Sequence, residues 1–227
     1  FLLAHRRELS EDGVVTIANW AHEKKVEATD ETYARFGYQP GQFIVSYFGN
    51  MGICQEMETL VSAVEQMADN NKVQFLFIGH GSKKPAIAER FEKKHLKNVQ
   101  MHDFLTGEAF EQAVAISSCC VVSLEKGLKG MCAPSKYYSY LQGGKAVLAV
   151  VEEGSYLEKE IEQECIGYAV QIGNDEGLMN KIIDMQQRSE STREMQIRAG
   201  RLYDQAYRLD KGLERYRNLF QNLLMGS

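Results

Sequence analysis

A proline, a serine and a lysine stand together at Pro134, Ser135 and Lys136, directly before a helix-like segment. Proline is favoured at the first position of a helix, so this spacing predicts a helix over 134–141. The first amides of a helix have no backbone partner and carry partial positive charge, which favours a bound anion. With the ammonium and the hydroxyl beside them, these amides are predicted to hold a phosphate or diphosphate group. A second interpretation stays open, in which Ser135 only caps the helix and Lys136 is a solvated first-turn residue.

Two glycine turns form a second group of candidate ligand contacts. Gly49, Asn50 and Gly52 follow one apolar run, and Gly79 and Gly81 follow the next. Glycine lets the backbone approach a ligand closely, and the Asn50 side chain can donate a hydrogen bond. The spacing does not match the G-x-G-x-x-G dinucleotide fingerprint, and the chain carries no Walker A, G-x-S-x-G or H-E-x-x-H motif. The turns therefore indicate contact with a ligand without specifying the reaction.

The segments that must position these residues alternate between strands and helices. Continuous apolar runs predict strands, and apolar residues at three- and four-residue spacing predict helices. Thr106 is expected to cap one helix, and Ser155 with Glu158 forms a capping-box pattern at the start of another. The predicted strands cover 43–48, 73–78, 98–104, 119–124, 145–151 and 167–172, and the predicted helices cover 55–68, 84–95, 108–117 and 134–141.

This alternation predicts the fold class. Strands that are joined through helices pair in parallel with right-handed crossovers, so we expect an α/β protein with a doubly wound parallel sheet covered on both faces. Ligands of such sheets bind beyond the carboxyl ends of the strands. The glycine turns and the Pro134 segment each follow a predicted strand, and they are therefore expected to meet at one edge of the sheet.

The two ends of the chain fall outside this core. Residues 1–42 contain a short apolar strand that runs into polar sequence, which is typical of a connector. The residues after 190 keep one helical apolar stripe, which predicts a long C-terminal helix that packs on the sheet or against something outside this chain. The stripe consists of Leu202, Tyr203, Ala206, Leu209, Leu213, Tyr216, Phe220 and Leu223. The chain begins at Phe1 without a signal-like segment, and we expect it to be part of a longer protein.

The composition narrows the classes of protein. The 31 acidic and 26 basic residues give a net charge of −5, which argues against a protein that grips a nucleic-acid backbone. No apolar run approaches the roughly 18 residues of a membrane helix. An odd number of cysteines without C-x-x-C spacing predicts reduced core thiols of a cytosolic protein and no zinc site. These cysteines are Cys54, Cys119, Cys120, Cys132 and Cys165.

Several segments, taken in order, resemble the donor-binding C-terminal domain of a GT-B glycosyltransferase. They are TIANWAHEKKVEA, FIVSYFGNMGICQEMETLVSAV, VQFLFIGHGSKKPAI, KNVQMHDFLTGEAFEQAVAISSCCVVSL, APSKYYSYLQGGKAVLAV and GYAVQIGNDEGLMNKI. The resemblance runs from about residue 14 to the C-terminus, and it is strongest to the family 4 (group 1) retaining enzymes of bacterial surface polysaccharide biosynthesis. It implies a connector over 1–42, a Rossmann-like nucleotide-sugar-binding domain over 43–190 and a helical segment over 191–227. It also implies an N-terminal acceptor-binding domain outside this chain.

The same resemblance implies a function and the residues that serve it. A UDP-sugar donor would give a hexosyl or N-acetylhexosaminyl group to a glycan or lipid-linked acceptor, without a metal ion or other cofactor. Helix amides and basic side chains would stabilise the departing diphosphate. The implied diphosphate contacts are Gly49, Asn50, Gly52, Pro134, Ser135 and Lys136, and the implied nucleoside contacts are Gly79, Gly81, Asp103, Phe104 and Ser139. The expected setting is the cytoplasm with peripheral membrane contact, and this chain alone is expected to be inactive without its N-terminal domain.

The sequence departs from the family pattern at charged positions. Many relatives carry an arginine, a lysine and two glutamates around the site, and uncharged residues replace all four here, namely Asn50, Gln55, Met131 and Ser139. Lys136, with Lys126 or Lys129, would then supply the positive charge. Two alternatives follow from these departures: a UDP-sugar 2-epimerase of the same fold, and a non-catalytic α/β interaction domain with a decayed pocket.

Overall fold

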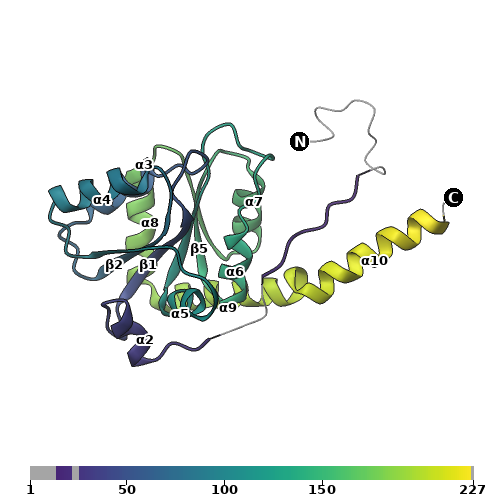
Figure 1. The fold of residues 1–227 in the computed structure, drawn as a ribbon, viewed down its shortest axis with the longest axis horizontal. Helices are drawn as coiled ribbons and strands as arrows, with labels where there is room; N and C mark the ends of the chain where they lie inside the picture. Colours follow the sequence, from purple (N-terminus) through teal and green to yellow (C-terminus); the bar gives the residue numbers. More distant parts are fainter. Residues whose placement is uncertain (1–13, 22–25, 226–227) are drawn as a thin grey trace.

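A six-stranded sheet forms the centre of the structure, and all of its strands are parallel (Figure 1). The computed structural model describes residues 14–21 and 26–225. The strands are β1 (Phe43–Asn50), β2 (Val73–His80), β3 (Val99–His102), β4 (Cys119–Ser123), β5 (Ala146–Val151) and β6 (Gly167–Gln171). Their spatial order is β3-β2-β1-β4-β5-β6, which runs outward from β1 in one direction and from β4 in the other. The predicted fold class, a doubly wound parallel sheet, is confirmed.

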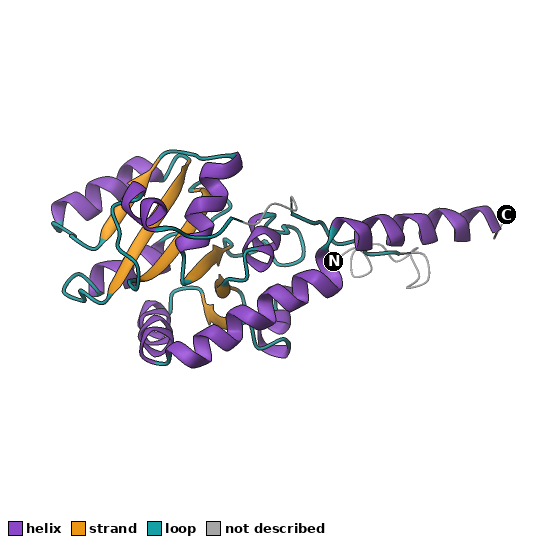
Figure 2. Ribbon diagram, turned by 90° about the horizontal axis from the view of Figure 1, so that it is seen from below, coloured by secondary structure: helices purple, strands orange, loops and turns teal. Residues whose placement is uncertain are grey.

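Helices cover both faces of this sheet (Figure 2). Side chains of α3, α4 and α8 pack on one face, and side chains of α5, α6, α7 and α9 pack on the other. The helical elements are α2 (Asp30–Arg35), α3 (Glu58–Gln66), α4 (Lys84–Lys93), α5 (Gly107–Ile116), α6 (Lys136–Gln142), α7 (Tyr156–Gln163), α8 (Asp175–Gln187), α9 (Ser189–Leu202), the π-helix η2 (Tyr203–Tyr207) and α10 (Leu209–Met225).

Alternating side chains of the strands separate the two layers of the core. In β1, Ile44 and Phe48 belong to the layer under α5 and α6, whereas Val45 and Tyr47 belong to the layer under α3 and α8. All residues of β4 and β5 are buried. Because helices cover both faces of the sheet, each central strand needs apolar side chains on both of its sides. This explains the continuous apolar runs in the sequence.

Two helix starts test the capping signals. Ser155 Oγ accepts a hydrogen bond from Glu158 N at 3.2 Å, as predicted, whereas the Glu158 carboxylate accepts from Gly154 N. The prediction for Thr106 is wrong, because its side chain makes no cap hydrogen bond at the start of α5. Gly107, the first residue of α5, has a φ of 57°, and this left-handed conformation turns the backbone directly after Thr106.

The carboxyl ends of β1 and β2 approach each other closely at glycines. Gly49 lies opposite Gly79 in the parallel ladder. A Cβ atom at Gly79 would lie 1.8 Å from the Gly49 carbonyl oxygen, and one at Gly81 would lie 2.5 Å from the Met51 carbonyl carbon. Only glycine at these positions leaves room for the backbone of the neighbouring strand end.

The prediction of a long C-terminal helix is confirmed by α10, but the helical segment is interrupted before that helix begins. α9 continues into the π-helix η2, and the extended backbone of Arg208 (φ −71°, ψ 153°) separates η2 from α10. These interruptions divide the apolar stripe, since a π-turn shifts the positions of the side chains that follow it. Leu202 and Tyr203 are buried, whereas Leu213 and Phe220 on α10 are 51% and 59% exposed. α10 projects away from the sheet (Figure 1).

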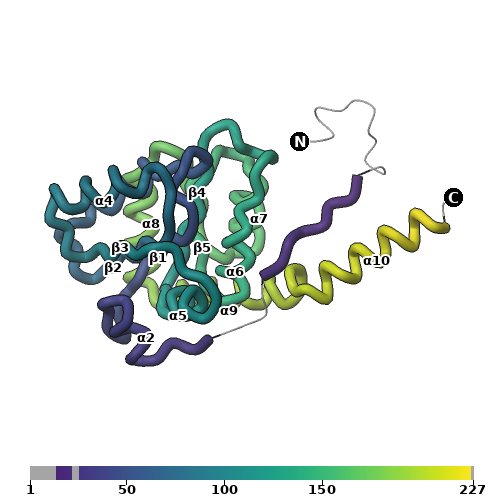
Figure 3. Tube along the Cα trace, in the orientation of Figure 1, coloured from purple at the N-terminus to yellow at the C-terminus, as the bar shows by residue number. Residues whose placement is uncertain are grey.

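Residues 14–21 form no strand, contrary to the prediction, and the end of this segment lies at the start of α10 (Figure 3). A Cβ atom at Gly212 of α10 would lie 2.7 Å from the Trp20 ring, and Tyr203 donates a hydrogen bond to the Ala21 carbonyl at 3.3 Å. The parts of the predicted connector at 1–13 and 22–25 lie outside the described residues. Residues 14–21 and α10 therefore lie on the same side of the sheet (Figure 1).

The prediction that the cysteines are core thiols holds for only part of the set. All five lie in the described part of the chain and are free thiols. Cys119 and Cys120 are buried in β4, and Cys132 is half-buried. Cys54 and Cys165 are exposed, because each lies in a connecting segment at the surface and not in the apolar strand or helix beside it.

Candidate functional site

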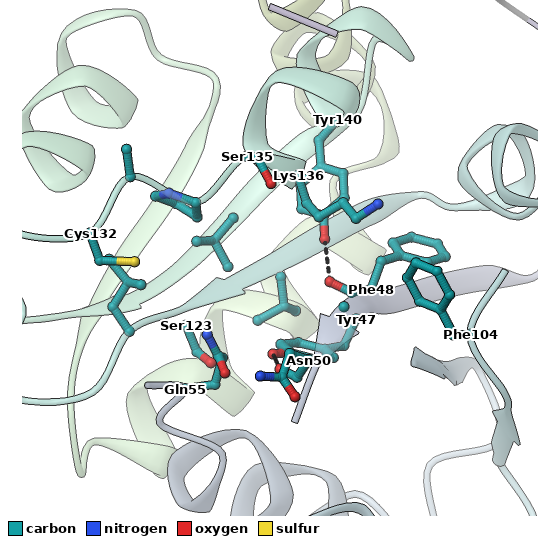
Figure 4. A pocket seen from close by; sticks show the side chains of 16 residues that line it. Tyr47, Phe48, Asn50, Gln55, Phe104, Ser123, Cys132, Ser135, Lys136 and Tyr140 are labelled. Carbon is teal, nitrogen blue, oxygen red and sulfur yellow. Dashed lines mark hydrogen bonds between the residues drawn. The ribbon is translucent and has the colours of Figure 1, made fainter. Parts of the chain in front are cut away.

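A cavity of about 290 Å³ opens at the carboxyl ends of β1 and β4, beside the start of α6 (Figure 4). Polar groups come from Tyr47, Asn50, Gln55, Ser123, Ser135, Lys136 and Tyr140, and the rest of the lining comes from Phe48, Gly49, Phe104, Val121, Val122, Leu124, Cys132, Ala133 and Pro134. Of these described residues, Lys136 alone carries a charge. The cavity lies where the strand order reverses, the usual ligand site of a doubly wound sheet.

The start of α6 differs in detail from the prediction, because the helix begins at Lys136 and not at Pro134. Tyr137 N donates to Pro134 O at 3.1 Å, which closes a separate tight turn before the helix. Ser135 has helical backbone angles but its side chain makes no cap hydrogen bond. Its hydroxyl instead lies at the cavity (Figure 4). The interpretation of Ser135 as only a helix cap is therefore wrong.

Lys136 is half-buried among aromatic rings and is not a solvated first-turn residue. Its Nζ lies 4.1 Å from the centroid of the Phe110 ring and 5.8 Å from that of Phe104. Burial lowers the pKa of the Lys136 ammonium, and the nearby Glu111 opposes that shift. The aromatic faces attract the cation, and an anionic ligand at the cavity would add to the favourable effect of Glu111 and offset the cost of burial.

The turn after β1 forms the opposite wall of the cavity. Gly49 has a φ of 127°, and a Cβ atom there would lie 3.9 Å from Lys136 Cγ, so the turn faces the first residue of α6. The Tyr47 hydroxyl donates a hydrogen bond to the Asn50 carbonyl at 2.7 Å, and this bond holds the turn to β1. Gly52 is buried and does not line the cavity; its Cβ position is 2.7 Å from Asn50 Nδ2.

The residues assigned to the nucleoside divide into two groups. Phe104 lines the cavity and meets the His80 ring edge to face at 5.1 Å. Asp103 is exposed, and a hydrogen bond from Lys84 at 2.6 Å lowers the pKa of its carboxyl. Gly79, Gly81, Asp103 and Ser139 do not belong to the cavity lining. Among the predicted site residues, the structure therefore brings together Gly49, Asn50, Phe104, Pro134, Ser135 and Lys136.

The other two predicted cations lie outside the cavity lining. Lys126 is exposed, and Lys129 Nζ donates to the Glu153 carbonyl at 2.9 Å. Lys83 contacts the segment after β1, because its Nζ donates a hydrogen bond to the Gln55 carbonyl at 2.6 Å. The same ammonium forms an ion pair with Glu125 at 3.2 Å. Sequence reasoning missed Lys83, although its place directly after the Gly81 turn is a signal that could have indicated it.

Three residues that bring a hydroxyl group to the cavity lining were also missed. Ser123 is the last residue of β4, so its place at the carboxyl edge was available from the strand prediction. Tyr47 and Tyr140 are buried within β1 and α6, and Tyr140 donates to the Phe48 carbonyl at 3.3 Å. No local sequence signal distinguishes these two tyrosines from ordinary core aromatics.

The residues that the structure describes, 14–21 and 26–225, bear on metal binding and on membrane insertion. In these ranges, no group of three or more His, Cys, Asp and Glu side chains could hold a metal ion. Within the same residues, no helix combines the length and the apolar character that crossing a bilayer requires.

Comparison with known proteins identifies the family. Residues 42–188 match the family described as glycosyl transferases group 1. WbjE, a probable glycosyltransferase of Pseudomonas aeruginosa, is 32% identical over 178 residues, which cover 75% of this chain and 43% of WbjE. The chain belongs to the group 1 glycosyl transferases. The chain spans less than half the length of WbjE.

Solved structures show that this group 1 chain shares its fold with glycosyltransferases. The S. aureus TarM structure in complex with Fondaparinux, alpha-GlcNAc-glycerol and UDP is similar with a TM-score of 0.73 and 21% identity, over 96% of this chain and 41% of TarM. Anabaena HepE in complex with UDP-glucose is similar with a TM-score of 0.72 and 15% identity, over 90% of this chain and 57% of HepE. The predicted GT-B relationship is confirmed.

Proposed function

We propose that this chain is the donor-binding half of a retaining glycosyltransferase and that the cavity beside α6 holds the diphosphate of a UDP-sugar. One observation carries the proposal. The Lys136 ammonium, the Ser135 hydroxyl, which makes no cap hydrogen bond, and the start of α6 meet at one cavity. This cavity lies where the strand order of the sheet reverses. TarM and HepE, which share the fold, were solved with UDP or UDP-glucose, and this supports a UDP-sugar donor.

The proposed contacts keep the predicted residues and divide their tasks. Asn50, Ser135 and Lys136 would contact the diphosphate directly, with Gly49 and Pro134 shaping the two walls. Phe104 would lie against the nucleoside, with Asp103 and Ser139 at its periphery. Gly52, Gly79 and Gly81 would act through the backbone, because the close approach of the two turns is what positions Asn50.

The proposed chemistry depends on charge that appears during transfer. The bond between C1 of the donor sugar and the diphosphate oxygen breaks, and the diphosphate keeps the electron pair. The acceptor hydroxyl gives its proton to the departing diphosphate oxygen and bonds to C1 on the same face of the sugar. Lys136 and the amides before Tyr137 would stabilise the departing diphosphate without a metal ion, because donors that are already in place are most effective where charge develops.

Two other functions make different demands on the site. A UDP-sugar 2-epimerase would need acidic and histidine groups in the cleft, and the cavity lining within the described residues contains neither a carboxylate nor an imidazole. A non-catalytic interaction domain would need no ligand at all. Both alternatives are therefore to be separated from the transferase by experiment.

Isothermal titration calorimetry of the 227-residue chain tests the proposal. We expect UDP to bind with a dissociation constant between about 1 µM and 1 mM, the range usual for enzyme substrates, and more tightly than inorganic phosphate. Addition of EDTA is expected to leave the affinity unchanged. If UDP, UDP-glucose and GDP all fail to bind, the donor-site proposal is wrong and the interaction domain is favoured.

We further propose a division of the chain into three parts. Residues 1–42 would connect to an acceptor-binding N-terminal domain, and residues 43–190 would bind the donor. Residues 191–227 would return to the acceptor-binding domain. Two observations support this division. Trp20 packs against Gly212, so the end of the 14–21 segment lies against α10. The relative WbjE is more than twice as long as its matching region. The transferase would act in the cytoplasm with peripheral membrane contact, on a glycan or lipid-linked acceptor of surface polysaccharide synthesis.

The exposed stripe of α10 gives a prediction for this arrangement. Its apolar side chains at Leu213, Tyr216 and Phe220 are 51%, 40% and 59% exposed. In the protein extended by its preceding domain, Phe220→Asp is expected to lower sugar transfer at least tenfold, because about 2 kcal/mol of apolar burial is lost between the domains. UDP binding by the 227-residue chain is expected to stay unchanged.

Asn218→Asp is the matched control, since residue 218 lies on the side of α10 opposite Leu213 and receives the same charge. Its transfer activity should equal that of the unaltered protein. Vesicle flotation with anionic lipids separates a membrane role, because loss of flotation in Phe220→Asp with transfer intact would contradict docking to a domain.

A further inference from the structure

We infer that Glu160 is a positioning residue that couples the start of α10 to the first turn of α6. The inference rests on the proposed function, because α6 begins with Lys136 at the donor site. The coupling elements are the hydroxyl of Tyr137 on α6, the carboxylate of Glu160 on α7 and the hydroxyl of Tyr207 on η2. Together they form a tyrosine–glutamate link between elements 70 residues apart in sequence (Tyr137 to Tyr207).

Each oxygen of the Glu160 carboxylate accepts one tyrosine hydroxyl. Tyr137 donates to Oε2 at 2.5 Å, and Tyr207 donates to Oε1. Tyr137 is 0% exposed and Tyr207 is 8% exposed, so water competes little for either bond. Hydrogen bonds to an ionised acceptor are roughly twice as strong as neutral ones, and shielding from water strengthens them further. The carboxylate therefore holds the two tyrosines in a fixed relation.

Ring contacts reinforce the tyrosine–glutamate link. The Tyr138 and Tyr207 rings are 5.1 Å apart between centroids at an interplanar angle of 64°, and the Tyr137 and Tyr207 rings are 6.4 Å apart at 70°. These edge-to-face arrangements are favourable for aromatic pairs. η2 is thereby packed on the first turn of α6, and a displacement of Tyr207 would have to disturb two neighbouring side chains of that turn.

One end of the tyrosine–glutamate link lies at the cavity, and the other end lies at the start of α10. Tyr137 directly follows Lys136, whose side chain lines the cavity. Tyr207 directly precedes Arg208, whose extended backbone separates η2 from α10. A change in the direction of α10 must therefore be absorbed at Arg208 or transmitted to Tyr207. In the proposed enzyme, docking of α10 on the preceding domain would bias the placement of Lys136, which is a coupling between two sites.

Hydrogen exchange of the 227-residue chain without ligand tests the link directly. Tyr207→Phe keeps the ring and removes only the hydroxyl on η2. We expect this variant to raise exchange of the α6 amides at 138–142 by about tenfold, the effect of one lost charge-assisted bond. The matched control is Tyr168→Phe, which removes a hydroxyl that donates to Asp184 at 2.8 Å between β6 and α8. The control should leave exchange in α6 unchanged.

The second measurement is UDP affinity, which a merely structural contact on η2 would not alter in a folded variant. Tyr137→Phe and Tyr207→Phe are each expected to weaken UDP binding about threefold to tenfold, and the double variant is expected to lose no more than the larger single effect, because both act through Glu160. Glu160→Gln keeps the shape and removes the charge, and it is measured in the same way if Tyr207→Phe does not fold.

The outcomes separate this inference from the proposed function. Unchanged α6 exchange in folded Tyr207→Phe, or fully additive losses in the double variant, would overturn the coupling. If the unaltered chain binds no UDP but Tyr207→Phe still raises exchange in α6, the donor-site proposal fails while the tyrosine–glutamate link stands.

Discussion

Lys136→Ala is expected to weaken UDP binding by the 227-residue chain about 30-fold. Lys136 is the one charged side chain among the described residues that line the cavity. A hydrogen bond from a charged donor contributes about 2 kcal/mol, and each 1.4 kcal/mol corresponds to about tenfold in affinity. Calorimetry with UDP measures the loss, and a thermal melt of the same sample confirms that the variant is folded.

Lys181→Ala is the matched control for this variant. Lys181 Nζ lies 4.4 Å from the centroid of the Tyr168 ring, so the control also removes a cation that lies over an aromatic ring. It lies on α8 and does not line the cavity. UDP affinity in Lys181→Ala should equal that of the unaltered chain. Equal affinities in both variants would contradict the role assigned to Lys136.

The same lysine gives the binding a pH dependence. Burial lowers the pKa of Lys136, so in the free protein its ammonium loses a proton below the pH at which a solvated lysine would. Only the protonated form attracts the diphosphate, so UDP affinity is expected to fall as pH rises through this lowered pKa. The folding stability changes with pH in the opposite direction. Burial of the charged Lys136 side chain costs free energy of folding at neutral pH, and this cost is gone once the pH exceeds the pKa that the lysine has in the unfolded chain. In Lys136→Ala the alkaline loss of affinity should be absent.

Gly79→Ala is expected to destabilise the fold by about 3 kcal/mol or to prevent folding. The added Cβ atom would lie 1.8 Å from the Gly49 carbonyl oxygen, a distance at which the backbone must shift. Gly49 and Gly79 are partners in the central β1–β2 ladder, so the shift would also disturb the turn that carries Asn50. Overpacking in a well-packed region typically costs about 1–3 kcal/mol of folding stability, and occasionally more. Urea denaturation followed by circular dichroism measures the loss.

Gly41→Ala provides the control for backbone strain alone. Gly41 has a φ of 86°, and nothing lies within 4 Å of its Cβ position. The expected cost is about 1 kcal/mol, from the left-handed backbone conformation. A loss in Gly79→Ala no larger than that in Gly41→Ala would show that the strand ends can separate easily, and the close approach of the two turns would then have no role in placing Asn50.

Much of the candidate site could be predicted because it follows from strand ends. Gly49, Asn50, Ser135 and Lys136 were found from a glycine turn and a proline–serine–lysine triplet that each follow an apolar run. Parallel strands bring their carboxyl ends to one edge, so position along the chain becomes position in space. Ser123 and Lys83 obey the same rule and could have been found with it.

The remaining contacts could not be predicted, because they depend on how elements pack. Tyr47 and Tyr140 look like core aromatics in the sequence, and they reach the cavity from opposite faces of the sheet only in the folded chain. The aromatic surroundings of Lys136 arise from Phe104 and Phe110, which flank the start of α5 and lie beside α6 only in the folded chain. Thr106 failed as a cap because the left-handed backbone of Gly107 directly follows it, a conformation that the capping pattern does not encode.

The sequence by itself determined the layered architecture of this protein and the edge at which a ligand would bind. Apolar runs alternating with amphipathic stripes admit few arrangements that bury every strand on both faces. The tertiary structure alone decided where the C-terminal helical segment breaks and which side chains reach across it. The reason is physical: a periodic stripe records which face is apolar, whereas the π-turn, the bend at Arg208 and the bonds of Glu160 to Tyr137 and Tyr207 depend on partners remote in sequence.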